Sequence, residues 1–138
     1  MRGVKKLFLD SDILLDLSLK RSVFFLPALN IIHLLEKGYF NAVTSSVAFV
    51  NIHYFLNKYD RLNKFSLLNE IRSVISIINV DEEIIDMALK SNSPDFEDAV
   101  QYYAAISGGC DAIITRNIKD YKQSTIPVLT AEQFLRTL

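Results

Sequence analysis

The chain has 138 residues, a length that fits one domain and is too short for two domains with separate hydrophobic cores. Half of its residues are hydrophobic and it holds only 4 Gly and 3 Pro, which excludes a disordered, collagen-like or linker-rich chain. Lys and Arg number 15 and Asp and Glu number 16, so no excess of positive charge marks the chain as a nucleic-acid binder. We therefore expect a single domain over residues 1–138, built around a substantial core.

Short apolar runs rich in β-branched residues alternate with helical patterns along the chain. The apolar runs predict strands over residues 4–9, 42–44, 74–78, 112–115 and 126–129. The helical spacing of apolar residues predicts helices over residues 13–19, 24–37, 46–58, 62–73, 81–90 and 93–107. We expect Pro94 at or near the first turn of the helix that ends at Gly108-Gly109, and Thr130 with Gln133 forms a capping box for a last helix.

This strand–helix alternation, with strands that are apolar on both faces, indicates a parallel sheet covered by helices on each side. The predicted fold class is α/β, a three-layer α/β/α sandwich with a short central parallel sheet of four to five strands. In such folds, ligands bind at the carboxyl ends of the strands. Side chains that follow the predicted strands are therefore the first candidates for a functional site.

Composition also bears on the compartment and on partners. Cys110 is the only cysteine, so the chain forms no internal disulfide and has no Cys/His zinc cluster. The N-terminal apolar run stops at Asp10, short of a signal-peptide core, and no apolar stretch of about 18 residues predicts a membrane span. We expect a cytoplasmic protein. A mean hydropathy of +0.20 is high for a soluble monomer and favours a homodimer.

Polar side chains converge on one edge of the predicted sheet. Asp10 and Asp12 follow the first strand, and the fourth strand is followed by Asn117 and Asp120. Their companions on the neighbouring helices are Asn51, Asp95 and Asp98. Singly, Asp10, Asp12 and Asp95 are equally well explained as helix caps. As a set, unpaired carboxylates at one edge repel one another, and a bound cation such as Mg²⁺ or Mn²⁺ compensates that repulsion.

Four segments carry a resemblance to a known family: FLDSDILLDL, TSSVAFVNIHYFL, SPDFEDAVQYYAA, and DAIITRNIKDY followed by IPVLTAEQFL. In order and spacing they resemble the PIN-domain ribonucleases, and among these the small VapC-type toxins. The resemblance spans nearly the whole chain. It implies a metal-dependent endoribonuclease that uses Mg²⁺ or Mn²⁺, acts as the toxin of a toxin–antitoxin pair, and is covered at its cleft by an antitoxin segment.

The resemblance also assigns residues to the site. Asp10 and Asp98 stand at positions of invariant family carboxylates, Asn117 and Asp120 lie where the family has its last acids, and Thr115 supports the cluster. Two positions depart from the family pattern: Asn51 replaces a glutamate, and Asn117 replaces an aspartate. An amide oxygen binds Mg²⁺ more weakly than a carboxylate does, so both changes lower the expected metal affinity.

The resulting hypothesis assigns Asp10, Asp98 and Asp120 as catalytic metal ligands, assisted by Asn117 and Asn51. Asp98 or Asp12 would orient the attacking water, and Asp95 and Thr115 support the cluster. Basic side chains near the site are expected to contact RNA phosphates, although a solvated charged face explains them as well. These are Arg21, Arg116 and Lys119.

Two alternatives remain open. With Asn51 and Asn117 in place of acids, the chain is alternatively a PIN-like binding module with weakened catalysis. The strand followed by Asp10-Ser11-Asp12 also has the DxD layout of a haloacid-dehalogenase-like phosphotransferase, in which one aspartate is the nucleophile and the other the general acid. Against this second alternative, no threonine stands two residues after Asp12, and the chain is short for that family.

Overall fold

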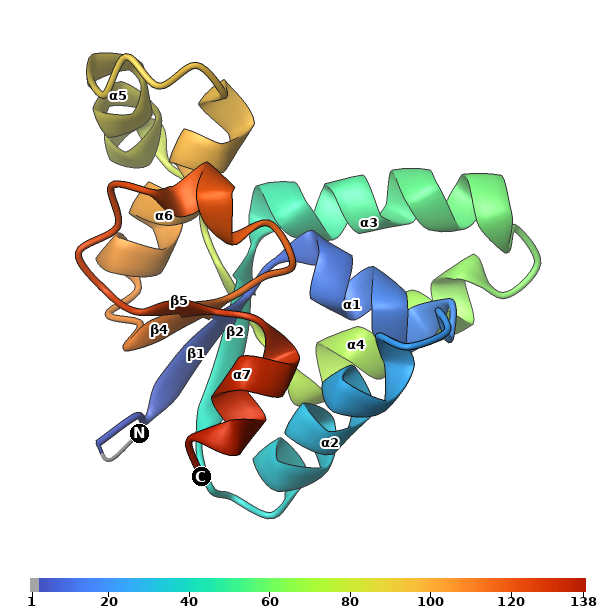
Figure 1. The fold of residues 1–138 in the computed structure, drawn as a ribbon. Helices are drawn as coiled ribbons and strands as arrows, with labels where there is room; N and C mark the ends of the chain where they lie inside the picture. Colours follow the sequence, from blue (N-terminus) through green and yellow to red (C-terminus); the bar gives the residue numbers. More distant parts are fainter. Residues whose placement is uncertain (1–2) are drawn as a thin grey trace.

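A computed structural model of the protein describes residues 3–138 and has five short strands in one parallel sheet, in the order β3-β2-β1-β4-β5 (Figure 1). The strands are β1 (Lys6–Leu9), β2 (Asn41–Ser45), β3 (Ser76–Ile78), β4 (Ala112–Ile114) and β5 (Val128–Leu129). The helices are α1 (Ser11–Ser18), α2 (Phe25–Glu36), α3 (Ser46–Tyr59), α4 (Lys64–Val74), α5 (Glu82–Lys90), α6 (Phe96–Ser107) and α7 (Ala131–Arg136), with a 3₁₀ turn η1 (Ile118–Tyr121). The predicted α/β/α sandwich with a five-strand parallel sheet is confirmed.

The central strand β1 explains why helices cover both faces of the sheet. Leu7, Phe8 and Leu9 are all fully buried, and successive side chains of a strand point to opposite faces. Leu7 and Leu9 belong to the core cluster that α1, α2, α4 and α7 cover, whereas Phe8 belongs to the cluster under α5 and α6. Each face of the sheet therefore has its own hydrophobic core.

The ends of the predicted elements differ from the structure by a few residues. Residues 74 and 75 were expected in the third strand, but α4 continues through Val74, because its apolar stripe at Leu68 and Ile71 stays packed on the core. Pro94 lies near the first turn of α6 as predicted, one residue before the N-cap. Asp95 is the N-cap of that helix, and its side chain accepts a hydrogen bond from the Asp98 amide. The capping box of Thr130 and Gln133 is confirmed.

Parallel pairing brings the carboxyl ends of β1 and β4 together. Leu9 pairs with Ile114 in the register, and the Asp10 amide continues the ladder by donating to the Ile114 carbonyl at 3.0 Å. Asp10 and Thr115 therefore leave the sheet side by side, although 105 positions separate them in the sequence. Among the helices of residues 3–138, none combines the length and apolar character that a membrane crossing requires.

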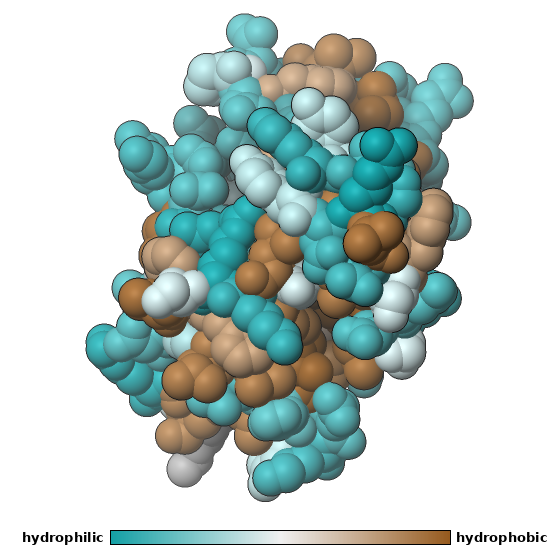
Figure 2. All heavy atoms as spheres, turned by 90° about the vertical axis from the view of Figure 1, so that its right-hand side faces the viewer, coloured by the Kyte–Doolittle hydropathy of each residue, from teal (hydrophilic) through white to brown (hydrophobic). Residues whose placement is uncertain are grey.

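Hydrophobic side chains gather on one face outside the core. Figure 2 shows them among hydrophilic groups on the side where α3, α4 and the α1–α2 connection lie. The exposed apolar residues of these elements are Val23, Phe24, Leu26, Val50, Tyr54, Phe55, Tyr59, Leu62 and Phe65. An apolar face of this extent on a small protein is typical of a surface that another chain covers.

Candidate active site

Asp10 is the buried centre of the site. It caps α1 by accepting from the Ser11 amide at 2.8 Å through Oδ1. Its Oδ2 accepts from the Tyr121 hydroxyl at 2.8 Å and from Thr115 Oγ1 at 2.9 Å. Burial raises the pKa of Asp10, and these three hydrogen bonds act in the opposite direction. The carboxyl group is thus held in one orientation by donors from three separate segments.

Asp12 ties the start of α1 to the segment after β4. Its Oδ2 accepts from the Arg116 amide at 3.0 Å and from Asn117 Nδ2 at 3.3 Å. Its Oδ1 is buried without a hydrogen-bond partner among the described residues. Burial and the nearby charge of Asp10 raise the pKa of Asp12 to about 6. The donors on Oδ2 therefore hold the Asp12 side chain against the segment that follows β4.

Arg116 lies in an ion pair behind the acids. Its guanidinium contacts the buried carboxylate of Asp16 through Nε at 2.9 Å and Nη2 at 3.1 Å, and Arg21 approaches the same carboxylate at 3.6 Å. The Arg116 guanidinium also stacks over the Phe24 ring, 4.1 Å from its centroid. Two of the three basic residues predicted to contact RNA are therefore already paired with one carboxylate.

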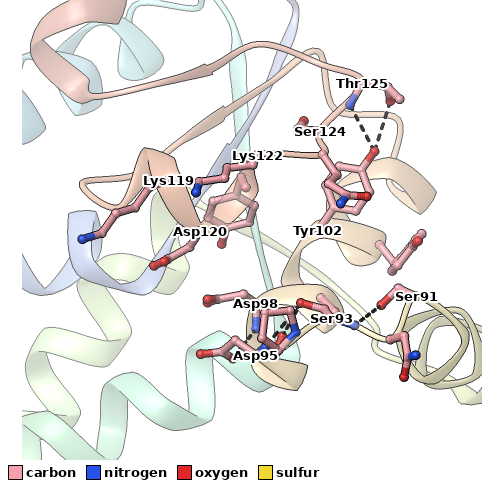
Figure 3. Close-up of a pocket in the computed structure, with 16 residues that line it drawn as sticks. Ser91, Ser93, Asp95, Asp98, Tyr102, Lys119, Asp120, Lys122, Ser124 and Thr125 are labelled. Atoms are coloured by element: carbon pink, nitrogen blue, oxygen red, sulfur yellow. Dashed lines mark hydrogen bonds between the residues drawn. The ribbon is translucent and has the colours of Figure 1, made fainter.

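The other carboxylates stand across the edge, at the start of α6. Asp98 is half-buried, and burial together with the charges of Asp95, Asp120 and Asp10 raises its pKa to about 7. Figure 3 shows Asp95 and Asp98 facing Asp120 across a cavity, with Lys119 and Lys122 on the side of Asp120. The electrostatic coupling of Asp98 to Asp10 and Asp120 means that the structure brings the three predicted catalytic acids into one neighbourhood.

Helix α3 contributes an amide to this neighbourhood. Asn51, one turn into α3, donates through Nδ2 to Glu97 Oε1 at 2.7 Å. Glu97 precedes Asp98 in the first turn of α6, so the bond joins the two helices that flank the acids. Beneath them, the buried Ser45 hydroxyl donates to Gln101 Oε1 in a short hydrogen bond. Asn51, which we expected to be a weak metal ligand, therefore donates its side-chain N–H group to a hydrogen bond within the protein.

The oxygen-rich donor set fits Mg²⁺ or Mn²⁺ chemically. Asp12 Oδ1 is buried without a donor, and Asp98 carries repulsion from three carboxylates, which a cation would relieve. Within residues 3–138, however, no three His, Cys, Asp or Glu side chains form a group that could by itself hold a metal ion. The oxygen ligands therefore suit a hard divalent cation chemically, but the side chains do not form a complete set of metal ligands.

Three residues of this network were not among the sequence-based candidates: Asp16, Tyr121 and Glu97. A signal for Asp16 existed, since a charged residue inside the apolar helix ILLDLSL, four positions after Asp12, faces the same side as Asp12. Tyr121 and Glu97 had no comparable signal. Their roles depend on the tertiary approach of η1 to β1 and of α6 to α3.

The fold and the site together define a class, an α/β/α protein with acidic residues gathered at the carboxyl edge of a parallel sheet. Residues 6–119 match the family model of the PIN domain, so the chain belongs to the PIN domain family. It is 29% identical over 135 residues to Ribonuclease VapC1 of Aquifex aeolicus (strain VF5), and the match covers 94% of this chain and 93% of that protein.

Solved structures confirm the fold. One is VapBC2 from Rickettsia felis bound to a DNA fragment from its promoter, with a TM-score of 0.68 and 19% identity over 90% of this chain and 96% of that one. Another is a toxin–antitoxin complex from Klebsiella pneumoniae, with a TM-score of 0.67 and 23% identity over the same shares of the two chains. The predicted membership of the PIN-domain family is confirmed by the match of residues 6–119 to the family model.

Proposed function

We propose that this protein is a metal-dependent endoribonuclease and the toxin of a toxin–antitoxin pair. The observation that carries the proposal is the Asp10 carboxyl group, buried at the end of β1, fixed by Thr115 and Tyr121 and electrostatically coupled to Asp98. Similarity to Ribonuclease VapC1 over nearly the whole chain supports nuclease activity. The proposed ligands of Mg²⁺ or Mn²⁺ are Asp10, Asp98 and Asp120, with Asn117 assisting.

The metal, when bound, would activate a water and offset the charge of the scissile phosphate. The protein's own residues prepare the site for this chemistry. Thr115 and Tyr121 fix the orientation of the Asp10 carboxyl group. Asp98, half-buried beside Asp120 and Asp10, is the carboxylate that would orient that water. Asp95 fixes the first turn of α6, from which Asp98 projects.

Lys119 is the basic residue best placed to contact the RNA backbone. It is exposed on η1 next to Asp120, and Lys122 lies one turn further on. Arg116 and Arg21 are paired with Asp16. To bind a phosphate, each guanidinium would have to contact Asp16 and the phosphate at the same time, or leave Asp16. We expect phosphate contacts chiefly from η1.

The decisive test is RNA cleavage by purified protein with and without Mn²⁺. We expect cleavage that depends on Mn²⁺ and that Asp10→Asn lowers by at least about 100-fold, because one metal-binding charge is lost. Glu132→Gln, an exposed substitution on α7, is the matched control and should leave cleavage unchanged. Cleavage by Asp10→Asn at the rate of the unchanged protein would overturn the proposal.

A second candidate function, a PIN-like binding module with weakened catalysis, is favoured by one observation. Asn51 stands where the family resemblance places a glutamate, and its Nδ2 group donates to Glu97. The two functions differ in metal binding. Calorimetric titration with Mn²⁺ up to millimolar concentration shows binding if the protein is a nuclease, and its absence, with intact RNA in the cleavage assay, would favour the binding module.

We also propose an antitoxin as the protein partner. Structural neighbours of this fold include VapBC2 and the Klebsiella pneumoniae toxin–antitoxin complex, and an antitoxin segment over the acids would block access to Asp10 and Asp98. We expect the cognate antitoxin, when co-expressed, to co-purify with this chain and to abolish its RNA cleavage. A co-purified partner that leaves cleavage unchanged would contradict the proposed inhibitory role.

A further inference from the structure

A cavity opens directly beside the acids. Its volume is about 560 Å³, within the range of small-molecule sites. Asp98 and Asp120 form part of its wall, and the remainder comes from the α5–α6 connection, from α6 and from the residues after η1. A phosphodiester held at the acids therefore has a hollow next to it, large enough for the nucleoside on one side of the scissile bond.

Aromatic rings form one wall of this cavity. Tyr102 and Tyr103 on α6 are both half-buried, with ring centroids 5.1 Å apart in an edge-to-face arrangement. The Tyr102 hydroxyl is fixed 3.2 Å from Thr125 Oγ1 and accepts from the Thr125 amide at 3.2 Å, as Figure 3 shows. A base that stacks on such a wall meets rings that are already ordered, so little conformational entropy is lost on binding.

The polar rim suits a nucleotide. Lys119 and Lys122 bring positive charge to a cavity whose opposite side carries Asp95 and Asp98. Three serine hydroxyls at the cavity already donate to backbone carbonyls: those of Ser91, Ser93 and Ser124. The exposed side-chain amides of Asn92 and Gln123 also line the cavity, and they are donors and acceptors for the edge of a base. Cations for phosphate, rings for stacking and amides for base edges therefore occur together.

We infer that this cavity binds one unpaired nucleoside of the RNA substrate, adjacent to the phosphate that is cleaved, with its base against the tyrosine wall. The inference rests on the proposed ribonuclease function and adds to it a subsite for an unstacked base. A base inside a duplex cannot reach such a wall, because its faces are covered by its neighbours. In this arrangement the residues that line the cavity select the base.

The test is binding of a single-stranded hexaribonucleotide of mixed sequence in EDTA, where no metal-dependent cleavage occurs. Loss of one stacking contact should weaken binding about 10-fold in Tyr103→Ala. Tyr103→Phe keeps the ring and should bind within about twofold of the unchanged protein. Tyr39→Ala, which removes an exposed tyrosine outside the cavity, should do the same. Equal binding by Tyr103→Ala and Tyr103→Phe would overturn the subsite alone.

A second measurement needs no substitution and so does not depend on the folding of a variant. A hexaribonucleotide that carries 4-thiouridine is photocrosslinked to the unchanged protein, and the crosslinked peptide is identified by mass spectrometry. We expect crosslinks on residues 102–103 or 122–125. Crosslinks confined to other segments would overturn the subsite alone, whereas RNA that stays intact in the Mn²⁺ cleavage assay would overturn the proposed function.

Discussion

At the scale of single residues, the site is organised by buried carboxylates whose negative charges are stabilised by different kinds of groups. Asp10 is stabilised by hydrogen bonds from neutral donors, and Asp16 by two guanidinium groups. Burial nevertheless raises the pKa of both, because water is removed from each carboxylate. Asp16 serves a structural role in this arrangement: it anchors Arg116 behind the acids, and Arg116 in turn covers Phe24.

Replacement of Asp16 tests this anchoring role. Asp16→Asn removes the charge that two arginines share, and we expect the free energy of unfolding to fall by about 2 kcal/mol. The loss is smaller than for a fully enclosed pair, because the Arg116 side chain keeps 30% exposure and can be hydrated. The measurement is urea unfolding followed by circular dichroism.

The matched control for Asp16→Asn is Glu132→Gln, which breaks the exposed ion pair with Arg136 on α7. An exposed pair one helical turn apart contributes at most about 0.5 kcal/mol. If both variants lose the same stability, the buried pair does not have the anchoring role that its contacts suggest.

At the scale of elements, the strand ends and the start of α6 form one acidic edge. The N-cap of α6 supplies Asp95, the first turn supplies Asp98, and η1 brings Asp120 opposite to them. A helix N-terminus carries a partial positive charge, which is smaller than the combined negative charge of three carboxylates. The edge is therefore less stable without a cation whenever all of its carboxyl groups are ionised.

This edge predicts how the stability of the metal-free protein depends on pH. The folded-state pKa of Asp98 is about 7 and that of Asp12 about 6, both above the value of about 3.9 in an unfolded chain. Between those values the folded state binds more protons than the unfolded state, so the free energy of unfolding falls as pH rises from about 5 to 8. Asp111, whose pKa is lowered, acts with the opposite sign and only at lower pH.

Urea unfolding in EDTA at pH 5 and pH 8 measures this effect. Asp98→Asn should reduce the loss of stability between the two values, since it removes one of the groups that releases a proton. Asp86→Asn, at an exposed position of α5, should leave the loss unchanged. A stability that is the same at both pH values in the unchanged protein would contradict the proposed repulsion at the acidic edge.

At the scale of the whole molecule, half of the residues are hydrophobic, and the two cores bury only some of them. Many of the exposed ones lie on α3, on α4 and on the connections α1–α2 and α3–α4, where Leu62 is 97% exposed; Phe65 on α4 is 62% exposed. We propose that a second copy of the chain covers this face in the free protein. The positive mean hydropathy of the sequence predicts such a covered surface.

Sedimentation velocity of two variants tests the dimer. The double substitution of Leu62→Ser with Phe65→Ser should shift the protein from dimer to monomer with little change in melting temperature, because both side chains are exposed. Leu89→Ser, also 62% exposed but on α5, is the control and should remain a dimer. A monomer in the unchanged protein at micromolar concentration would contradict the proposal.

The sequence by itself determined the order of the elements and the fold class. Strand–helix alternation and fully apolar strands leave few arrangements other than a covered parallel sheet, which is why β1 to β5 were predicted in kind even where their ends shifted. The same rule placed Asp10 and Asp12 at one edge with Asn117 and Asp120 before any contact was known. Local patterns also identified caps correctly, such as Thr130 with Gln133.

Only the tertiary structure decided which partners these residues have. Tyr121 reaches Asp10 across 111 positions, Arg116 reaches Asp16 across 100, and Asn51 reaches Glu97 across 46. Hydrophobic periodicity specifies which face of an element is buried, but it contains no information about which polar groups meet between elements. Hydrogen bonds and ion pairs are directional and short in range, so they are settled only when the helices have packed at their final distances and angles.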